Sequence, residues 1–294
     1  MTSFNLRSPS LKLGQKQPFL LYGTAFKRER TAEFTKTALE LGFQGIDTAN
    51  QPSAYREAFA GDGLSATIDA GIKREALFIQ SKFTPIRGHD KDKIPFNPDQ
   101  SIEGQIRESI SQSLQHLKLD YLDALILHCP FEDDADNLVA WKVFETYVPS
   151  TVRHLGVSNI SLPVLRQIYE EATVKPVIIQ NRFFKGTGYD VEVRAFAQEH
   201  GILYQTFGVL KNNPHLLASG LVASVAEKLN LEKELALYVL VLGLGDVQIL
   251  DGTTSPDRMK NDLKTIAEVT NDDRLLKDLA PSFKSFPLLL EKSV

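Results

Sequence analysis

Eight short apolar segments, separated by longer stretches of helical periodicity, constrain the fold of this chain more than any other feature. Most are continuous apolar runs, as expected for parallel strands that are covered by helices on both faces. The expected strands are Phe19–Thr24, Gly45–Ala49, Leu77–Phe83, Ala124–Cys129, His154–Ser158, Val177–Asn181, Leu203–Val209 and Val247–Asp251. Eight alternations of strand and helix predict an α/β fold, either a doubly wound sheet or a closed barrel.

The segments between the strands show the spacing of amphipathic helices. The clearest stripe consists of Ile102, Ile106, Ile110, Leu114 and Leu117, which repeat at the helical period. No Gly-x-Gly-x-x-Gly motif follows the first expected strand, and this weakens the interpretation as a doubly wound dinucleotide-binding sheet. We therefore expect residues 1–294 to form one (β/α)₈ barrel domain, a size that such barrels often reach.

Composition and charge exclude several classes of protein. The net charge is −4 with no basic stripe, which argues against a nucleic-acid partner, and the mixed-sign run from Lys27 to Arg30 is expected to be a solvated loop or helix start. Cys129 is the only cysteine, so a reducing compartment fits. Residues 1–10 lack a signal-peptide pattern, and the apolar run Leu235–Leu244 is shorter than the roughly 20 residues that span a bilayer. We expect a soluble cytoplasmic protein with no membrane partner, either a monomer or a weak oligomer.

Polar side chains stand at the carboxyl ends of several expected strands, where the strands of a barrel converge on one rim. Asp47, Lys82 and His128 each interrupt or end an apolar run. Each has an ordinary explanation by itself: a turn cap, a lysine that reaches solvent, and a satisfied core histidine. Their shared position at one end of successive strands favours a functional site. A buried lysine is costly unless paired, and Asp47 on the neighbouring strand is the expected partner of Lys82.

Four segments together resemble the signatures of the aldo-keto reductase superfamily. They are Gly45-Ile46-Asp47-Thr48-Ala49, Ser81-Lys82, Leu127-His128 and Gly156-Val157-Ser158-Asn159. Their order and separations match the family over most of the chain, from about residue 11 to residue 263. The resemblance implies a barrel, a nicotinamide cofactor bound across the rim, a small-molecule carbonyl substrate, and a catalytic tetrad of Asp, Tyr, Lys and His.

The resemblance also assigns roles to individual residues. Asp47, Lys82 and His128 match three members of the tetrad, and Asp47 is counted with the cofactor-binding residues as well. The further cofactor positions are Ser158, Asn159 and Gln180 for the nicotinamide carboxamide, Phe207 for stacking on the nicotinamide ring, and Thr253 and Arg258 for the adenosine phosphate. The family more often has Tyr at the position of Phe207. No metal is required by this chemistry.

Two positions depart from the family pattern. The tetrad tyrosine usually lies closer to the aspartate, whereas Tyr55, the nearest candidate here, follows Asp47 by eight residues. A longer turn must therefore deliver Tyr55, and the ordinary alternative is that Tyr55 belongs to the first turn of the next helix. The second departure is Gly252, which stands where a lysine commonly contacts the adenosine phosphate.

The expected activity is reduction of aldehydes or ketones, with hydride from the nicotinamide and a proton from Tyr55. We expect Lys82 to lower the pKa of Tyr55 and His128 to orient the carbonyl oxygen. NADP(H) is the expected cofactor, because Arg258 lies at the start of a helix opened by Ser255-Pro256, and NAD(H) is the alternative.

Two other functions remain open at this point. One is a nicotinamide-binding sensor or accessory subunit with little turnover, which the displaced tyrosine would favour. The other is a Schiff-base aldolase that uses Lys82, although Asp47 beside it would keep the amine protonated. Substrate specificity is expected to come from three loops that break the alternation of strands and helices: Thr84–Gln100, Gly208–Pro214 and the tail from Pro281 to Val294.

Overall fold

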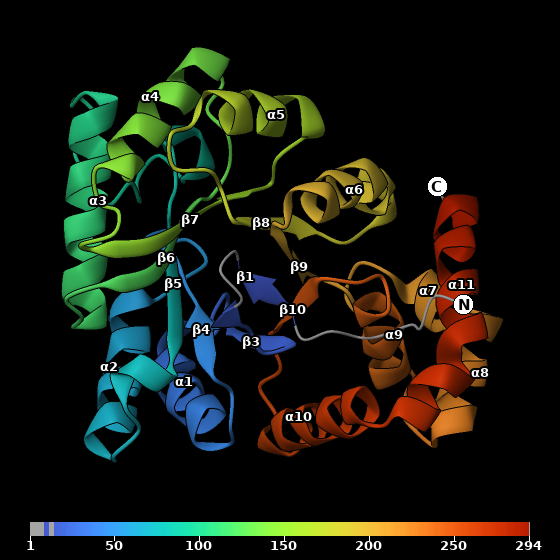
Figure 1. Cartoon of the computed structure of the whole chain (residues 1–294). Helices are drawn as coiled ribbons and strands as arrows, with labels where there is room; N and C mark the ends of the chain where they lie inside the picture. Colours follow the sequence, from blue (N-terminus) through green and yellow to red (C-terminus); the bar gives the residue numbers. More distant parts are fainter. Residues whose placement is uncertain (1–8, 12–14, 294) are drawn as a thin grey trace. The chain divides into compact units, whose positions relative to one another are not determined.

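Eight parallel strands form a closed barrel in the computed structural model, which describes residues 9–11 and 15–293. The order around the barrel is β10-β3-β4-β5-β6-β7-β8-β9, so strands that are consecutive along the chain are neighbours in the sheet (Figure 1). The strands are β3 (Leu20–Gly23), β4 (Gly45–Asp47), β5 (Phe78–Phe83), β6 (Leu122–Leu127), β7 (Val152–Ser158), β8 (Ile178–Arg182), β9 (Leu203–Phe207) and β10 (Val247–Asp251). The predicted barrel is confirmed, and every expected strand is present with bounds that shift by at most two residues.

Two short strands precede the barrel and were not predicted. Strands β1 (Ser10–Leu11) and β2 (Gln15–Lys16) pair in antiparallel fashion. Residues 1–8, most of the amino-terminal segment that lacks a signal-peptide pattern, lie outside the described residues. Of the helices in the part of the chain that is described, none combines the length and apolar content needed to cross a membrane.

Helices and short 3₁₀ turns fill the connections between strands. The α-helices are α1 (Thr31–Glu40), α2 (Glu57–Asp69), α3 (Ile102–Leu117), α4 (Asp134–Glu145), α5 (Leu162–Glu171), α6 (Val191–His200), α7 (Pro214–Leu217), α8 (Gly220–Leu229), α9 (Lys233–Leu242), α10 (Pro256–Asn271) and α11 (Asp273–Ser293). The 3₁₀ turns are η1 (Arg28–Arg30), η2 (Arg74–Ala76), η3 (Ile86–Gly88) and η4 (Lys185–Asp190). The segment Thr84–Gln100, expected to be a loop, contains only η3.

The expectation that the tail after Pro281 is irregular was wrong. Helix α11 runs through both Pro281 and Pro287, although an interior proline removes a backbone hydrogen bond and costs about 3 kcal/mol. The apolar side chains of α11 offset this cost because they share one face of the helix. The buried members are Leu276, Leu279, Phe283, Phe286 and Leu290. The tail therefore contributes a packed helix rather than a loop.

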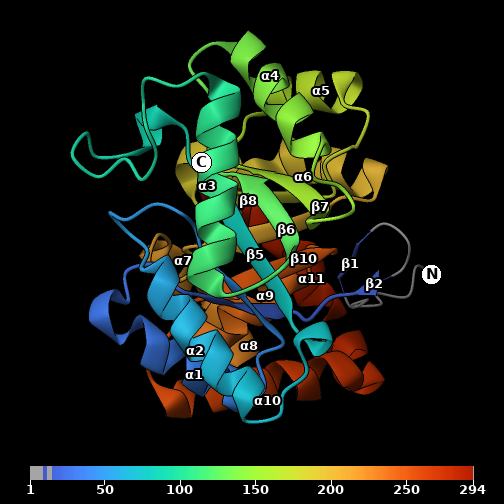
Figure 2. The ribbon, with the colours of Figure 1, turned by 90° about the vertical axis from the view of Figure 1, so that its left-hand side faces the viewer.

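Contacts between Cα atoms divide the chain into two compact units, and one of them holds most of the residues that the sequence singled out. This unit comprises residues 21–180 and 251–256. Its helices α1 to α5 contact one another in chain order, and Figure 2 shows α2 and α3 lying against the strands of the same unit. Gly61 permits close contact between α2 and α3, because a Cβ atom there would overlap the backbone carbonyl of His116.

The other unit comprises residues 1–20, 181–250 and 257–294. Within it, β9 and β10 pair in parallel, and α11 contacts α8 and α9. The most completely buried helix is α9, in which all residues from Leu235 to Leu242 are buried. That explains the long apolar run at this point of the sequence. Whether the chain behaves as the single domain expected from the sequence stays a prediction.

Candidate active site

The centre of the candidate site is a buried ion pair between Asp47 and Lys82. Asp47 ends β4, and Lys82 lies on the neighbouring strand β5. Lys82 Nζ donates to Asp47 Oδ2 at 2.6 Å and to the carbonyl oxygen of Thr48 at 2.9 Å, and the two charged side chains are only 0% and 3% exposed. The other oxygen of the carboxylate accepts from the side-chain amides of Gln80 (2.6 Å) and Gln180 (2.9 Å). Both charges are thus compensated, as burial of charged groups requires.

The turn between β4 and α2 brings Tyr55 to this ion pair despite the longer spacing. The Tyr55 hydroxyl lies 3.4 Å from Lys82 Nζ, and Lys82 Nζ lies 4.8 Å from the centre of the Tyr55 ring. Helix α2 begins only at Glu57, so Tyr55 belongs to the turn and not to the helix. The third N–H donor of the Lys82 ammonium is therefore directed at Tyr55, the tyrosine predicted from the sequence.

Gln51 organises this turn through both ends of its side-chain amide. Its Oε1 accepts from the backbone N–H of Ala54 at 2.8 Å, and its Nε2 donates to the carbonyl oxygen of Gly88 at 3.0 Å. The backbone N–H of Tyr55 also donates to the carbonyl oxygen of Gln51 at 3.0 Å. A side chain that caps a turn in this way restricts it to one conformation. Gln51 thereby links the Tyr55 turn to the 3₁₀ turn η3 in the loop after β5.

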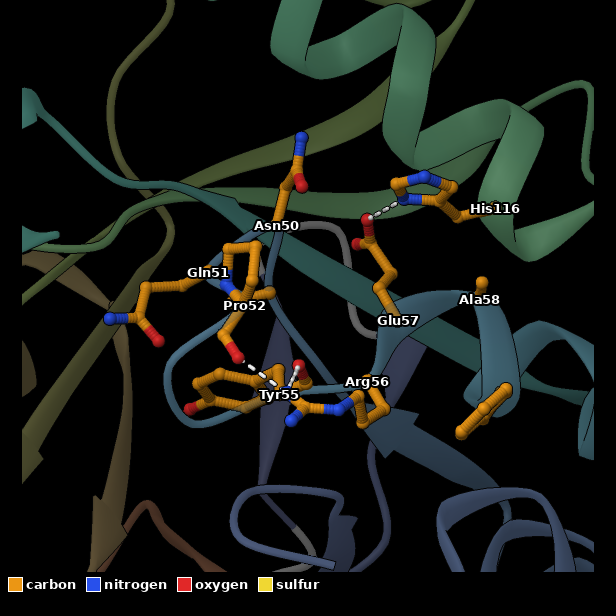
Figure 3. A pocket seen from close by; sticks show the side chains of 10 residues that line it. Asn50, Gln51, Pro52, Tyr55, Arg56, Glu57, Ala58 and His116 are labelled. Carbon is orange, nitrogen blue, oxygen red and sulfur yellow. Dashed lines mark hydrogen bonds and ion pairs between the residues drawn. The ribbon is translucent and has the colours of Figure 1, made fainter. Parts of the chain in front are cut away.

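Beyond Tyr55, the start of α2 is fixed to the barrel by a buried carboxylate. The carboxylate of Glu57 accepts from the hydroxyl of Ser81, the residue before Lys82 on β5, and its other oxygen lies 3.1 Å from His116 Nδ1. Figure 3 shows Glu57 directed at His116 beside a hollow of about 160 Å³, which the Tyr55 turn and the end of α3 line. Tyr55 is therefore held on one side by Gln51 and on the other by Glu57.

His128 completes the group of residues around Tyr55. The two rings meet edge to face with centroids 5.9 Å apart. His128 follows directly after β6, and its Nδ1 lies 2.7 Å from the hydroxyl oxygen of Thr84, which follows β5. Thr84 therefore occupies Nδ1, and Nε2 is the other ring nitrogen of His128.

Electrostatics in the site differ from the sequence expectation in one respect. Burial raises the pKa of Tyr55, and although Lys82 opposes this rise, Asp47 adds to it. The expected lowering of the Tyr55 pKa is therefore wrong for the chain alone, because desolvation outweighs the attraction of the ammonium. Burial also disfavours the Lys82 ammonium, but Asp47 and Tyr55 together hold the pKa of Lys82 above its ordinary value. Burial, with the charge of Lys82, lowers the pKa of His128 well below 6.5.

Comparison with known proteins identifies the family of this chain. The model of the Aldo/keto reductase family matches residues 10–214. The chain belongs to the aldo/keto reductase family. The uncharacterized oxidoreductase YtbE of Bacillus subtilis (strain 168) is 30% identical over 281 residues, which cover 93% of this chain and 92% of that protein. Glyoxal reductase of the same organism is 30% identical over 232 residues, or 77% of this chain and 75% of the relative.

Solved structures agree on the fold. The crystal structure of an aldo/keto reductase from Brucella melitensis superimposes with a TM-score of 0.76 at 23% identity, and the match covers 95% of this chain and 97% of that one. Membership of the aldo/keto reductase family makes this chain an oxidoreductase with carbonyl reduction as its general chemistry. A nicotinamide nucleotide is the class of cofactor that the family uses.

The residues expected to hold the carboxamide of such a cofactor lie next to the tetrad. Ser158 ends β7, and its hydroxyl donates to the carbonyl oxygen of Gln180 on β8 at 2.6 Å. Asn159 is exposed and in the left-handed region (φ 52°), and its Nδ2 donates to the carbonyl oxygen of His128 at 2.8 Å. An exposed amide oxygen beside His128 fits a carboxamide donor. The Gln180 amide, by contrast, is committed to Asp47.

The remaining residues that the sequence predicts to bind the cofactor lie on three segments. Phe207 ends β9 and is half-buried, with the guanidinium carbon of Arg182 at 5.6 Å from the centre of its ring. Arg258 is exposed in the first turn of α10, which begins at Pro256 as predicted. Thr253 lies in the turn between β10 and α10, where its carbonyl oxygen accepts from the hydroxyl of Tyr22 at 3.2 Å. Both Phe207 and Arg258 belong to the unit that does not contain the tetrad.

The sequence pattern does not mark several polar residues of the site. Gln51, Glu57, Thr84 and His116 lie in no motif, and only their contacts in the folded chain mark them. Lys27 was grouped with the solvated run that follows it. Arg28, Glu29 and Arg30 are exposed as expected, but Lys27 is half-buried and donates to the carbonyl oxygen of Gly252. Among the described residues, no cluster of three or more His, Cys, Asp or Glu side chains could hold a metal ion.

Proposed function

We propose that this aldo/keto reductase reduces small aldehydes and ketones to alcohols with NADPH and that Tyr55 donates the proton. The observation that carries the proposal is the chain of contacts from Asp47 to Lys82 to Tyr55, with distances of 2.6 and 3.4 Å. A phenol that lies against a fixed, buried ammonium is suited to protonate an oxygen on which negative charge develops. The nicotinamide, when bound, supplies the hydride that reduces the carbonyl carbon.

Tyr55 enters the reaction as a neutral phenol, because burial and Asp47 raise its pKa. The carbonyl oxygen of the substrate would take the Tyr55 proton as negative charge develops on that oxygen. The tyrosinate that remains is paired with the Lys82 ammonium at 3.4 Å. Lys82 thus acts by stabilising the charge left after proton transfer, and Asp47 holds Lys82 in the protonated state.

His128 orients the substrate as a neutral imidazole. Its pKa is lowered well below 6.5 by burial and by Lys82, so the ring carries no charge at neutral pH. The Thr84 hydroxyl lies 2.7 Å from Nδ1, and in the tautomer that we propose it donates its proton to Nδ1, so that the ring proton lies on Nε2. That N–H is the hydrogen-bond donor for the carbonyl oxygen, next to the Tyr55 hydroxyl.

The Schiff-base alternative is disfavoured by the state of Lys82. An amine nucleophile must lose its proton to attack a carbonyl. Lys82 instead donates to Asp47, to Thr48 and to Tyr55, and its pKa lies above the ordinary value. Lys82 therefore functions as a fixed cation.

Cofactor preference and substrate class extend the same proposal. Arg258 at the start of α10 supports NADPH, since a guanidinium binds the 2′-phosphate through two parallel hydrogen bonds. The relatives include proteins named glyoxal reductase in B. subtilis and methylglyoxal reductase DkgB in Escherichia coli O157:H7. Short dicarbonyls are therefore the first substrates to examine, followed by aldehydes and ketones with a larger apolar part.

The test is oxidation of NADPH and of NADH by the unmutated protein in the presence of glyoxal, methylglyoxal and a panel of aldehydes, ketones and sugars. Tyr55→Phe should bind the cofactor with unchanged affinity and lose at least roughly 100-fold in turnover. Wild-type turnover in Tyr55→Phe would show that another group donates the proton. Cofactor binding without turnover of any carbonyl would favour the sensor function instead.

A further inference from the structure

The turn between β10 and α10 lacks the lysine that the family places at position 252, yet an ammonium group lies at this turn. It belongs to Lys27, which follows β3 and is far from Gly252 in sequence. Lys27 Nζ donates to the carbonyl oxygen of Gly252, and it lies 5.7 Å from the centre of the Tyr22 ring. The hydroxyl of Tyr22 in turn donates to the carbonyl oxygen of Thr253. Two residues of the β3 segment thus hold the turn that would meet the cofactor phosphate.

Glycine at position 252 leaves room for the Lys27 side chain. A Cβ atom built at Gly252 would lie 3.4 Å from Lys27 Nζ and 3.9 Å from the carbonyl oxygen of Gly23. These are ordinary contact distances, so a side chain is sterically tolerated at Gly252, but it would extend into the space beside the Lys27 ammonium. Two ammonium groups at this distance would repel each other. Glycine at position 252 therefore avoids a repulsion with the Lys27 ammonium, which lies where a lysine side chain at 252 would extend.

The backbone around Lys27 is held in an unusual conformation. Phe26 (φ 60°) and Arg28 (φ 53°) on either side both lie in the left-handed region, which non-glycine residues seldom adopt. The N–H of Phe26 donates to the carbonyl oxygen of Ala54 at 2.7 Å, and the hydroxyl of Thr31 donates to that of Arg28 at 2.7 Å. Such conformations persist where surrounding contacts impose them, and they concentrate at functional sites. Here they direct Lys27 toward the turn, whereas the next three residues are exposed.

The ammonium keeps capacity for a ligand. Lys27 has three N–H donors, and the contact to Gly252 uses one of them. Partial burial lowers the pKa of Lys27, while the nearby carboxylate of Asp251 opposes this effect and favours the charged form. The hydroxyl groups of Thr253 and Thr254 lie in the same turn.

We propose that Lys27 binds a phosphate group of the nicotinamide cofactor, in the role that the family gives to a lysine at position 252. The inference rests on the proposed function only in that the chain binds such a cofactor. The same cation is supplied from the segment after β3 instead of from the turn after β10. Lys27 is accordingly part of the binding site, and the contact to Gly252 is what holds its ammonium there.

Binding of NADP⁺ and NAD⁺ tests this without any reliance on turnover. Isothermal titration would compare the unmutated protein, Lys27→Met, Gly252→Lys, Lys27→Met with Gly252→Lys, and Arg28→Met as a control for the loss of a neighbouring exposed charge. Loss of one charge-assisted contact should weaken NADP⁺ binding roughly 10- to 100-fold in Lys27→Met. Arg28→Met should leave it within about twofold, since an exposed charge without a direct contact contributes little.

The double variant separates ligand binding from a structural role. If Lys27 binds the phosphate, a lysine at 252 restores most of the affinity that Lys27→Met loses. If Lys27 only holds the Gly252 carbonyl, Gly252→Lys changes the affinity by the same factor whether or not Lys27 is present, and that result would overturn the proposal. A loss confined to NADP⁺ assigns the contact to the 2′-phosphate, and an equal loss for NAD⁺ assigns it to the diphosphate.

Two further results distinguish a failure of this inference from a failure of the proposed function. Affinity of Lys27→Met equal to that of the unmutated protein would refute this inference alone. Failure of the unmutated protein to bind either nucleotide would refute the proposed function itself. Thermal unfolding of each variant identifies any loss of affinity that comes from a loss of folded protein.

Discussion

The turn after β4 and the turn after β10 both depart from the family pattern, and the chain compensates for the two departures in different ways. In the first, extra residues separate Asp47 from Tyr55, and the side chain of Gln51 folds the longer turn so that the tyrosine still reaches Lys82. In the second, a side chain is missing at Gly252, and Lys27 from another segment occupies its place. The first compensation is local and the second is long-range. Catalysis should therefore depend on contacts within the first turn, and cofactor affinity on contacts made to the second.

The largest effect on turnover is expected for substitution of Lys82, the cation that Tyr55 of the first turn contacts. Lys82→Met should reduce turnover by roughly 100-fold or more, because the tyrosinate left after proton transfer loses its counter-charge. Steady-state kinetics with saturating NADPH measures this. The variant also leaves Asp47 buried without a cation, which is destabilising. Adding Asp47→Asn should recover stability in thermal unfolding but not turnover, and recovery of turnover would contradict the role of Lys82.

The next largest effect, on cofactor affinity, is expected for Arg258 in helix α10, which follows the second turn. Arg258→Ala should weaken NADPH binding roughly tenfold or more and spare NADH, because a charge-assisted contact contributes about 1.5–3 kcal/mol. Fluorescence titration with both cofactors is the measurement. If the two dissociation constants are already equal in the unmutated protein, Arg258 does not select NADPH and the enzyme uses both cofactors. Combined with Lys27→Met, the variant would show whether the two cations act on one phosphate, since their effects would then not be additive.

A smaller effect is expected within the first turn. Gln51→Leu removes both side-chain hydrogen bonds and should lower turnover roughly three- to tenfold, in line with about 0.5–1.5 kcal/mol per bond. Cofactor affinity should not change. Gln51→Glu is the matched control, because it keeps the acceptor for Ala54 N–H but cannot donate to the carbonyl oxygen of Gly88. If both variants keep full turnover, the Tyr55 turn holds its conformation without Gln51.

The smallest effect is a dependence of stability on pH at the start of α2. The hydrogen bond to Glu57 raises the pKa of His116 although burial opposes it. A raised folded-state pKa means that protonated His116 stabilises the fold fully below the unfolded pKa of about 6.5. The contribution is lost as the pH rises through the folded-state pKa. Because the His116 side chain is 35% exposed, solvent screening limits the contribution to a few tenths of a kcal/mol.

Thermal unfolding of the unmutated protein and of His116→Gln between about pH 5.5 and 8.5 measures this contribution. The difference in unfolding free energy should be largest at the acidic end and should decrease as the pH rises. A difference that is the same at every pH would show that His116 contributes through packing alone.

The sequence by itself determined the barrel and three members of the candidate tetrad. The strands can be read from local hydrophobic patterns, and Asp47, Lys82 and His128 follow from them, because the carboxyl ends of parallel barrel strands lie on one rim. The bounds of β10 match the expectation from the pattern, and those of the other barrel strands shift by at most two residues.

Tertiary structure decided what depends on contacts between distant segments. Spacing along the chain could propose Tyr55, but only the folded turn brings its hydroxyl within 3.4 Å of Lys82. Lys27 looked like part of a charged surface run, since nothing local indicates that it reaches Gly252. The tail was expected to be a loop because it breaks the alternation of strands and helices, whereas burial of one apolar face made the tail a helix. Local sequence patterns determine where helices and strands form. Contacts between polar side chains, and the direction in which their pKa values shift, depend on burial, and burial is created only by packing of the whole chain.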